Sequence, residues 1–271
     1  MSKRNSQANK SAARERLRAE RERQAKKDKV RKQLVVGVSV VAVLAIAGGV
    51  GYGVMQMNKP SVWEAAADAK NVTAPKNTSG DDGTTVVIGK DSAKKTLELY
   101  EDSRCPVCAT FEQAVGEKVA KDVEAGTYKI KYIGATFIDN MSNGEGSKNA
   151  LSALGAALDV SPEAFLDYKA ALYSAEFHPE ETDDKFAKDD YLIKVANSVD
   201  ALKGNKAFEK AVKDGTYDAW AMKMSKAFDK SGVQGTPTLM MDGKKITAEG
   251  SDNSPMTEAE FTTAITAALK G

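Results

Sequence analysis

The sequence predicts an α/β domain with a partly parallel sheet and an inserted helical region, preceded by one transmembrane helix. Two alternating segments flank an amphipathic helix between residues 96 and 138, which predicts a strand–helix–strand unit. Helical periodicity dominates the insertion, from about residue 140 to 215, and residues 34–55 contain no charge. With 42% hydrophobic and 28% charged residues among 271, the composition excludes a disordered, collagenous or disulfide-scaffold protein.

Residues 1–33 form a strongly basic segment, with thirteen Lys and Arg against four Asp and Glu. The segment holds a single Leu, so it cannot bury enough apolar surface to order itself, and we expect a disordered cytoplasmic tail. Binding to nucleic acid or anionic lipid is the alternative. Interspersed Glu residues and the lack of an aromatic side chain for base stacking favour a topology determinant without a nucleic-acid partner.

Residues 34–55 form an uncharged run of 22 residues, long enough as a helix to cross a hydrocarbon core about 30 Å thick. The alternative is a cleaved signal peptide, for which Ala45-Ile46-Ala47 offers small residues at cleavage spacing. We favour an uncleaved signal anchor, because secretory apolar regions are typically about 7 to 15 residues long. The basic flank then places the N-terminus in the cytoplasm and everything after the span outside, in a single-pass cell-membrane protein.

Residues 56–84 are rich in Asn, Asp, Gly, Ser, Thr and Pro without a sustained apolar period, which predicts a flexible linker. Residues 85–271 have the length of one domain with a substantial core. Its first strands are predicted at Val86 to Ile88, a short apolar run, and at Thr96 to Tyr100, which alternates.

A long helix is predicted from Cys105-Pro106 to a stop at Gly126, because apolar residues recur there at three- and four-residue spacing. Lys129 to Ile138 alternates again as a strand, so the strands on either side of this helix are expected to run parallel. The following helices are predicted from their apolar faces and from a Ser161-Pro162 cap, around residues 151–158, 162–172, 191–199 and 220–228.

The C-terminal part is predicted as a hairpin followed by a helix. Asp242-Gly243 is a strong two-residue turn signal between strands at residues 238–241 and 244–247. Thr257 and Glu260 form a capping box before the last amphipathic helix.

The two cysteines of the chain, Cys105 and Cys108, lie three positions apart between a strand and a helix. Cys105 meets the unpaired N–H groups and the positive dipole end of that helix, which stabilise a thiolate. Cys108 lies one turn further on, close enough to attack a mixed disulfide. Arg104 adds a positive charge, which Glu101 and Asp102 oppose. Placed outside the cytoplasm, the pair predicts a redox-active disulfide.

Other roles for these cysteines fit less well. A structural zinc site usually needs four Cys or His ligands, whereas the chain has two Cys and one His, so we expect no metal. A purely structural disulfide would close too short a loop to add much stability, and two inert thiols would not explain the strand-to-helix position. His178, the sole histidine, lies in a predicted loop and is interpreted as a surface residue.

Three segments together resemble the DsbA-like branch of the thioredoxin-fold superfamily, over about residues 84–271. They are Tyr100-Glu101-Asp102-Ser103-Arg104, the following Cys105-Pro106-Val107-Cys108, and Gly232-Val233-Gln234-Gly235-Thr236-Pro237-Thr238 before the hairpin strand. The resemblance implies a thioredoxin fold with an inserted helical subdomain. It also implies that Cys105 is the exposed nucleophile, that Cys108 is the resolving thiol, and that the Thr236-Pro237 bond is cis beside them.

The resemblance further implies a substrate-binding surface. The Thr236 backbone would pair with an extended segment of the substrate, with Pro106, Val107 and Gly235 around it. The best-known strongly oxidising members have His where this chain has Val107, which leaves the direction of electron flow open.

These features predict a membrane-anchored, extracytoplasmic thiol:disulfide oxidoreductase that forms or exchanges disulfides in exported proteins. No organic cofactor or metal is expected, and a separate membrane redox partner would recycle the cysteine pair. Two alternatives stay open. One is a reductase for apocytochromes or metal chaperones, and the other is a non-catalytic module that binds copper or a client chain through the same cysteines.

Overall fold

A five-stranded mixed sheet forms the centre of the part of the chain that the computed structural model describes, which is Arg23, Lys27 and residues 61–80 and 83–270. The spatial order is β1-β3-β2-β4-β5, and β2 runs parallel to β3 while the other neighbouring pairs are antiparallel. The strands are β1 (Val86–Ile88), β2 (Thr96–Asp102), β3 (Lys129–Ala135), β4 (Thr238–Met241) and β5 (Lys244–Lys245). The predicted parallel strand–helix–strand unit is therefore confirmed.

Helix α3 (Pro106–Ala125) connects β2 to β3. Cys105 is its N-cap, and Pro106 occupies the first turn, where a missing N–H costs no hydrogen bond. Gly126 ends the helix at a φ of 81°, a left-handed conformation that glycine adopts without steric strain. Cys105 consequently lies where a central strand ends and a helix begins.

Six α-helices and one short 3-10 helix lie between β3 and β4. They are α4 (Ile138–Met141), α5 (Gly146–Val160), α6 (Pro162–Tyr173), η1 (Lys185–Ala187), α7 (Asp189–Ala196), α8 (Lys206–Lys213) and α9 (Asp218–Lys230). Ser161 caps α6 as predicted, since its hydroxyl accepts from Ala164 N at 3.0 Å. The strand predicted to reach Ile138 is shorter, because Ile138 N donates to the Asp102 carboxylate at 3.2 Å and begins α4 instead.

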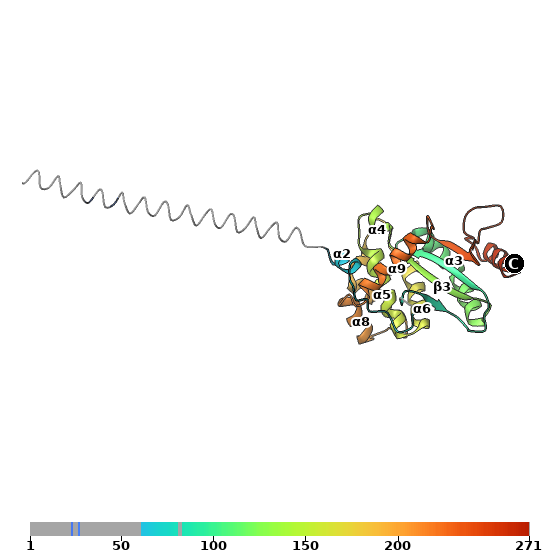
Figure 1. Ribbon diagram of the computed structural model, residues 1–271, viewed down its shortest axis with the longest axis horizontal. Helices are drawn as coiled ribbons and strands as arrows, with labels where there is room; N and C mark the ends of the chain where they lie inside the picture. The colour runs from blue at the N-terminus through green and yellow to red at the C-terminus, as the bar shows by residue number, and fades with distance from the viewer. Residues whose placement is uncertain (1–22, 24–26, 28–60, 81–82, 271) are drawn as a thin grey trace, which may run out of the picture. The chain divides into compact units, whose positions relative to one another are not determined.

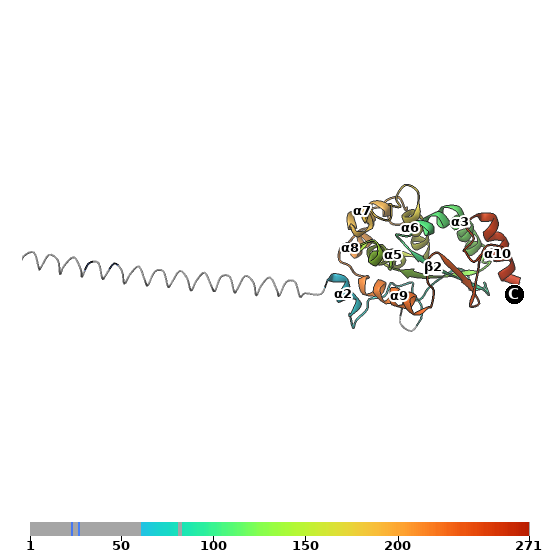
Figure 2. The same ribbon diagram turned by 90° about the horizontal axis from the view of Figure 1, so that it is seen from above.

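Different helices cover the two faces of the sheet (Figures 1 and 2). α3 and the C-terminal α10 (Glu258–Lys270) lie on one face, together with α6, and α9 lies on the other. Side chains alternate between these faces along β2. Leu99 faces the groove between α3 and α6, whereas Tyr100 packs against Phe228 of α9 with ring centroids 6.2 Å apart.

The C-terminal hairpin has the predicted turn. Asp242 and Gly243 both have positive φ, 52° and 74°, as a two-residue hairpin turn requires. β5 is shorter than the predicted strand at 244–247, because the chain turns after Ile246 and Ala248 N pairs with Asn253 O at 2.9 Å. The capping box of α10 forms, since Glu260 N donates to the Thr257 hydroxyl at 3.3 Å.

The segment before β1 differs from the prediction of a flexible linker over residues 56–84. Its described part begins with helix α2 (Val62–Ala67), whose N-terminus is capped by a capping box of Ser61 and Glu64. The Trp63 side chain is buried, and Trp220 Nε1 of α9 donates to Gly83 O at 2.9 Å. Such a segment lacks an apolar period because it docks through single side chains and backbone atoms rather than through a helical face.

The remaining N-terminal predictions fall largely on residues that are not described. These are the disordered tail at 1–33, apart from the helical Arg23 and Lys27, and the transmembrane helix at 34–55. Within the described part of the chain, no helix is both long enough and apolar enough to cross a membrane.

Candidate active site

The two cysteines lie together at the N-terminal end of α3. Cys105 and Cys108 are both thiols and pack in one cluster with Ala109, Ile138 of α4 and Tyr173 of α6. The turn before them is fixed, because Cys105 N donates to Asp102 O at 2.9 Å. The fold thus brings residues from β2, α3 and the helical insertion to one site.

The Cys105 sulfur is set up to carry negative charge. A hydrogen bond from the Cys108 thiol, opposed by burial and assisted by Thr236 and by the helix N–H groups of Val107 and Cys108, lowers the pKa of Cys105 to about 6. Cys105 is nonetheless only 6% exposed, so the expectation of an exposed residue is corrected. Its sulfur lies 3.5 Å from the Thr236 carbonyl oxygen, and this loop covers it.

Cys108 has the opposite character. It is fully buried, and burial together with the hydrogen bond to Cys105 raises the pKa of its thiol well above the ordinary value. At neutral pH one sulfur is therefore largely ionised and the other protonated, although both belong to the same helical turn.

The predicted substrate-binding residues surround Cys105. The Thr236-Pro237 peptide bond is cis, as expected, and the Ser254 hydroxyl donates to Pro237 O at 2.8 Å, which fixes the loop from behind. Pro106 and Val107 are exposed, Val107 at 50%, and Gly235 and Thr236 are half-buried.

Arg104 does not act as the free positive charge that its position suggested. Its side chain is 1% exposed and lies between two carboxylates, at 2.9 Å from Asp139 and 3.3 Å from Asp184. It also donates to Glu181 O at 2.7 Å. The guanidinium is thus neutralised and ties the turn before Cys105 to the helical insertion.

A buried ion network beneath the cysteines was not predicted. Lys169 of α6 lies 3.3 Å from Glu101 of β2 and also pairs with Glu112 of α3. Burial, opposed by Lys169, raises the pKa of Glu101 to about 7. Strand alternation contained a signal for this acid, because Leu97, Leu99 and Glu101 must face the same side.

His178 is also closer to the site than predicted. Its ring stacks on Tyr173 with centroids 5.9 Å apart, and its Nε2 atom is buried without a hydrogen-bond partner. Burial lowers the pKa of the imidazole, which favours the neutral form. The surface interpretation is corrected: the 174–180 loop folds back onto α6.

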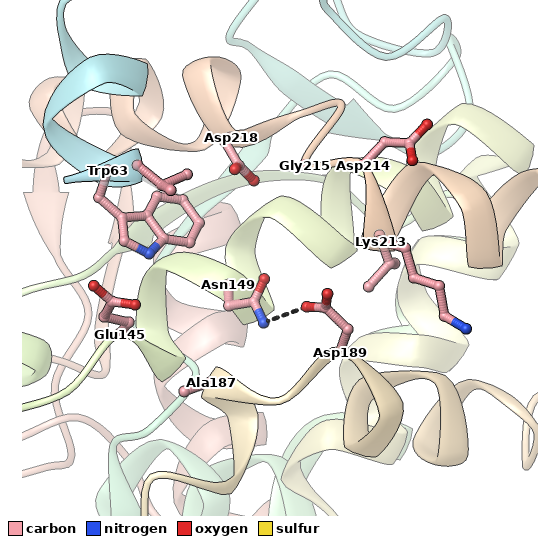
Figure 3. A pocket seen from close by; sticks show the side chains of 11 residues that line it. Trp63, Glu145, Asn149, Ala187, Asp189, Lys213, Asp214, Gly215 and Asp218 are labelled. Carbon is pink, nitrogen blue, oxygen red and sulfur yellow. Dashed lines mark hydrogen bonds between the residues drawn. The ribbon is translucent and has the colours of Figure 1, made fainter. Parts of the chain in front are cut away.

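A separate pocket of about 260 Å³ lies beside α2, where Trp63 and Asn149 line it with Asp189 and Asp218 (Figure 3). Asn149 Nδ2 donates to the Asp189 carboxylate at 3.0 Å. None of the residues that line this pocket belongs to the cysteine cluster.

A Cys-X-X-Cys pair at the start of a helix, beside a cis-proline loop on this sheet, defines a thioredoxin-fold dithiol protein. A family model described as thioredoxin matches residues 81–267. The chain belongs to this family, and within it is a DsbA-like thiol:disulfide oxidoreductase.

The similar proteins support this assignment. Disulfide bond formation protein D of Bacillus subtilis is 27% identical over 161 residues, which cover 59% of this chain and 68% of that protein. The solved structure of oxidised DsbA from Mycobacterium tuberculosis is 25% identical with a TM-score of 0.53, covering 66% of this chain and 99% of that one. MdbA, a thiol-disulfide oxidoreductase from Actinomyces oris, is 21% identical with a TM-score of 0.58 and coverages of 77% and 96%, which shows the fold alone.

Proposed function

We propose that Cys105 and Cys108 form or exchange disulfides in exported proteins, as the catalytic pair of a membrane-anchored enzyme whose domain lies outside the cytoplasm. The observation that carries this proposal is the contrast between the two sulfurs, because thiol–disulfide exchange needs a good leaving thiolate beside a second thiol. The substrate segment binds around Cys105 through Thr236, Gly235, Pro106 and Val107. Thr236 and Pro237 complete the catalytic site beside the two cysteines.

In the oxidising direction, a substrate thiolate attacks the Cys105 sulfur of the Cys105–Cys108 disulfide. A substrate–Cys105 disulfide forms, and the electron pair of the broken bond goes to Cys108. A second substrate thiolate then attacks the substrate sulfur and releases Cys105 as a thiolate. A pKa of about 6 stabilises that leaving group at neutral pH and so favours the reduced enzyme and the oxidised substrate.

Cys108 must gain or lose a proton in each cycle, and Glu101 is the acid–base group that serves it. The buried carboxyl has a pKa of about 7, close to neutral, and interacts electrostatically with Cys105 and Cys108. Lys169 and Glu112, its partners, line a groove of about 530 Å³ between α3 and α6, so the network around Glu101 adjoins this groove.

A Cys108→Ser variant tests the exchange chemistry in cells. We expect it to accumulate mixed disulfides between Cys105 and exported proteins, visible as adducts that disappear on reduction, because the resolving thiol is gone. A Cys105→Ser variant is the matched control and should form none. A copper or client-binding module would lose its ligand in Cys108→Ser without forming such adducts, and that result would contradict the proposal.

The direction of electron flow is tested by the reduction potential of the pair, measured on the full chain by equilibration with glutathione. A value close to about −120 mV, which is typical of a strongly oxidising dithiol whose reduced form is stabilised, would support the oxidising direction. A value near about −270 mV would instead indicate a reductase, which would deliver electrons to disulfides of apocytochromes or metal chaperones. In either case a separate membrane redox partner recycles the pair.

A further inference from the structure

Helix α6 of the inserted region supplies two buried side chains to the space beneath the cysteines. Lys169 and Tyr173 lie one helical turn apart, on the same face, and are 4% and 0% exposed. Lys169 belongs to the ion network with Glu101, whereas Tyr173 packs in the cluster that contains Cys105 and Cys108. Tyr173 is therefore a fully buried aromatic member of the dithiol cluster, against which the partly buried Phe137 also packs.

The Tyr173 ring is held from several sides. The backbone carbonyl oxygen of Tyr173 accepts a hydrogen bond from Gln113 Nε2 of α3 at 2.7 Å, which connects the end of α6 to the active-site helix. The Lys169 ammonium lies 5.5 Å from the ring centroid, and the His178 ring stacks at 5.9 Å. The direction of the hydroxyl is consequently fixed by packing, not by a hydrogen bond of its own.

The Tyr173 hydroxyl is buried and has no hydrogen-bond partner. Tyr132 shares this property, but two other buried tyrosines have a partner: Tyr168, on the same helix, donates to Leu192 O at 3.0 Å, and Tyr128 donates to Asp122 at 3.2 Å. A buried hydroxyl without a hydrogen-bond partner costs free energy. This cost is offset in a state of the site that offers the hydroxyl an acceptor. Such an acceptor appears during exchange, when Cys108 loses its proton.

Electrostatics restrict what this hydroxyl can do. Burial, with Glu101, Tyr132 and Cys108 nearby, raises the pKa of Tyr173 well above its ordinary value. The phenol therefore keeps its proton at neutral pH. It can donate a hydrogen bond to an anion but cannot act as a base.

We propose that the Tyr173 hydroxyl donates a hydrogen bond to the Cys108 sulfur as that thiol is deprotonated, which makes Tyr173 a catalytic residue for closure of the Cys105–Cys108 disulfide. The inference rests on the proposed function. In this step Glu101 takes the Cys108 proton, and the Cys108 thiolate attacks Cys105 in a mixed disulfide. The new bond joins Cys105 to Cys108, and the electron pair of the broken bond leaves with the partner thiolate.

Tyr173→Phe tests the proposal, since it removes the hydroxyl and keeps the ring. The full chain is loaded with glutathione on Cys105, and release of glutathione by Cys108 is followed against pH. We expect release at pH 7 to be about tenfold slower than in the unchanged protein, the factor that corresponds to one unit in the Cys108 pKa. The tenfold reduction in the release rate should stay constant with rising pH and disappear only above the Cys108 pKa.

Tyr168→Phe is the matched control, because it removes a buried hydroxyl from the same helix that already has a partner. It should lower the Tm and leave glutathione release unchanged, whereas Tyr173→Phe should slow release without lowering the Tm. A Tm loss in Tyr173→Phe as large as in the control would mean that its hydroxyl is already paired, and would overturn the proposal.

Two further outcomes separate this inference from the function on which it rests. If the unchanged chain and Tyr173→Phe release glutathione at the same rate at each pH, the proposed role of Tyr173 is wrong and the exchange function stands. Slowing in Tyr132→Phe alone would likewise reject Tyr173, because the Tyr132 hydroxyl is also buried and unpaired. If the unchanged chain cannot close its disulfide at all, the proposed function itself fails.

Discussion

The two faces of β2 carry different chemistry on adjacent residues. Tyr100 faces α9 and packs edge to face on Phe228, in a small apolar cluster. Glu101 faces α6, where Lys169 pairs it in the buried network beneath the cysteines. The Tyr100–Phe228 contact is apolar packing whose strength does not depend on protonation, whereas the Glu101–Lys169 contact joins two buried charges whose cost does. Strand alternation thus places these two kinds of contact on opposite sides of β2, at neighbouring residues.

The largest effect that distinguishes the two faces is expected from Lys169→Met. Removal of the ammonium leaves the Glu101 and Glu112 carboxylates without their cation, and loss of one partner of a buried pair costs about 3–5 kcal/mol. Urea unfolding of the reduced chain at pH 7.5 measures this loss. It should shrink at pH 4.5, where Glu101, whose pKa is raised to about 7, takes up a proton.

Phe228→Leu is the matched change on the α9 face. We expect it to cost about 1 kcal/mol at both pH values, because only apolar packing is altered. If the loss of free energy of unfolding changed with pH equally in both variants, the two contacts would not differ in their dependence on protonation.

A smaller effect is expected from Glu101→Gln. The pKa of Glu101 rises from 4.5 to about 7 on folding, so the native state holds a proton that the unfolded chain has already released. This contribution to the free energy of unfolding is complete below about pH 4.5 and is lost as the pH rises to about 7. Gln does not titrate, so the variant should gain stability relative to the unchanged protein across that window. Urea unfolding at half-unit steps measures the difference, and a constant offset would show that Glu101 does not titrate there.

The features that could be predicted from the sequence are those whose signals are local. The Asp242-Gly243 turn, the Gly126 helix stop and the Ser161 cap each depend on residues within a few positions, and the structure confirms all three. The strand–helix–strand unit around Cys105 follows from periodicity in the same way.

The rest depends on contacts between residues that are far apart in the sequence. Glu101 could be placed on an inward face, but its partner Lys169 lies on a helix whose docking no local pattern specifies. Arg104 looked like a free charge because Asp139 and Asp184, which neutralise it, lie far along the chain, in α4 and just before η1. His178 was expected at the surface because stacking on Tyr173 depends on how the 174–180 loop folds back.

The chain has only two tryptophans, and the docked N-terminal segment has a spectroscopic consequence through them. Trp63 belongs to α2, and Trp220 of α9 holds Gly83 by its indole N–H. Neither indole belongs to the cysteine cluster. Intrinsic fluorescence therefore reports how the segment before β1 sits on α9. An emission change on reduction of the dithiol would mean that the redox state of the cysteines affects the contact between α9 and the segment before β1.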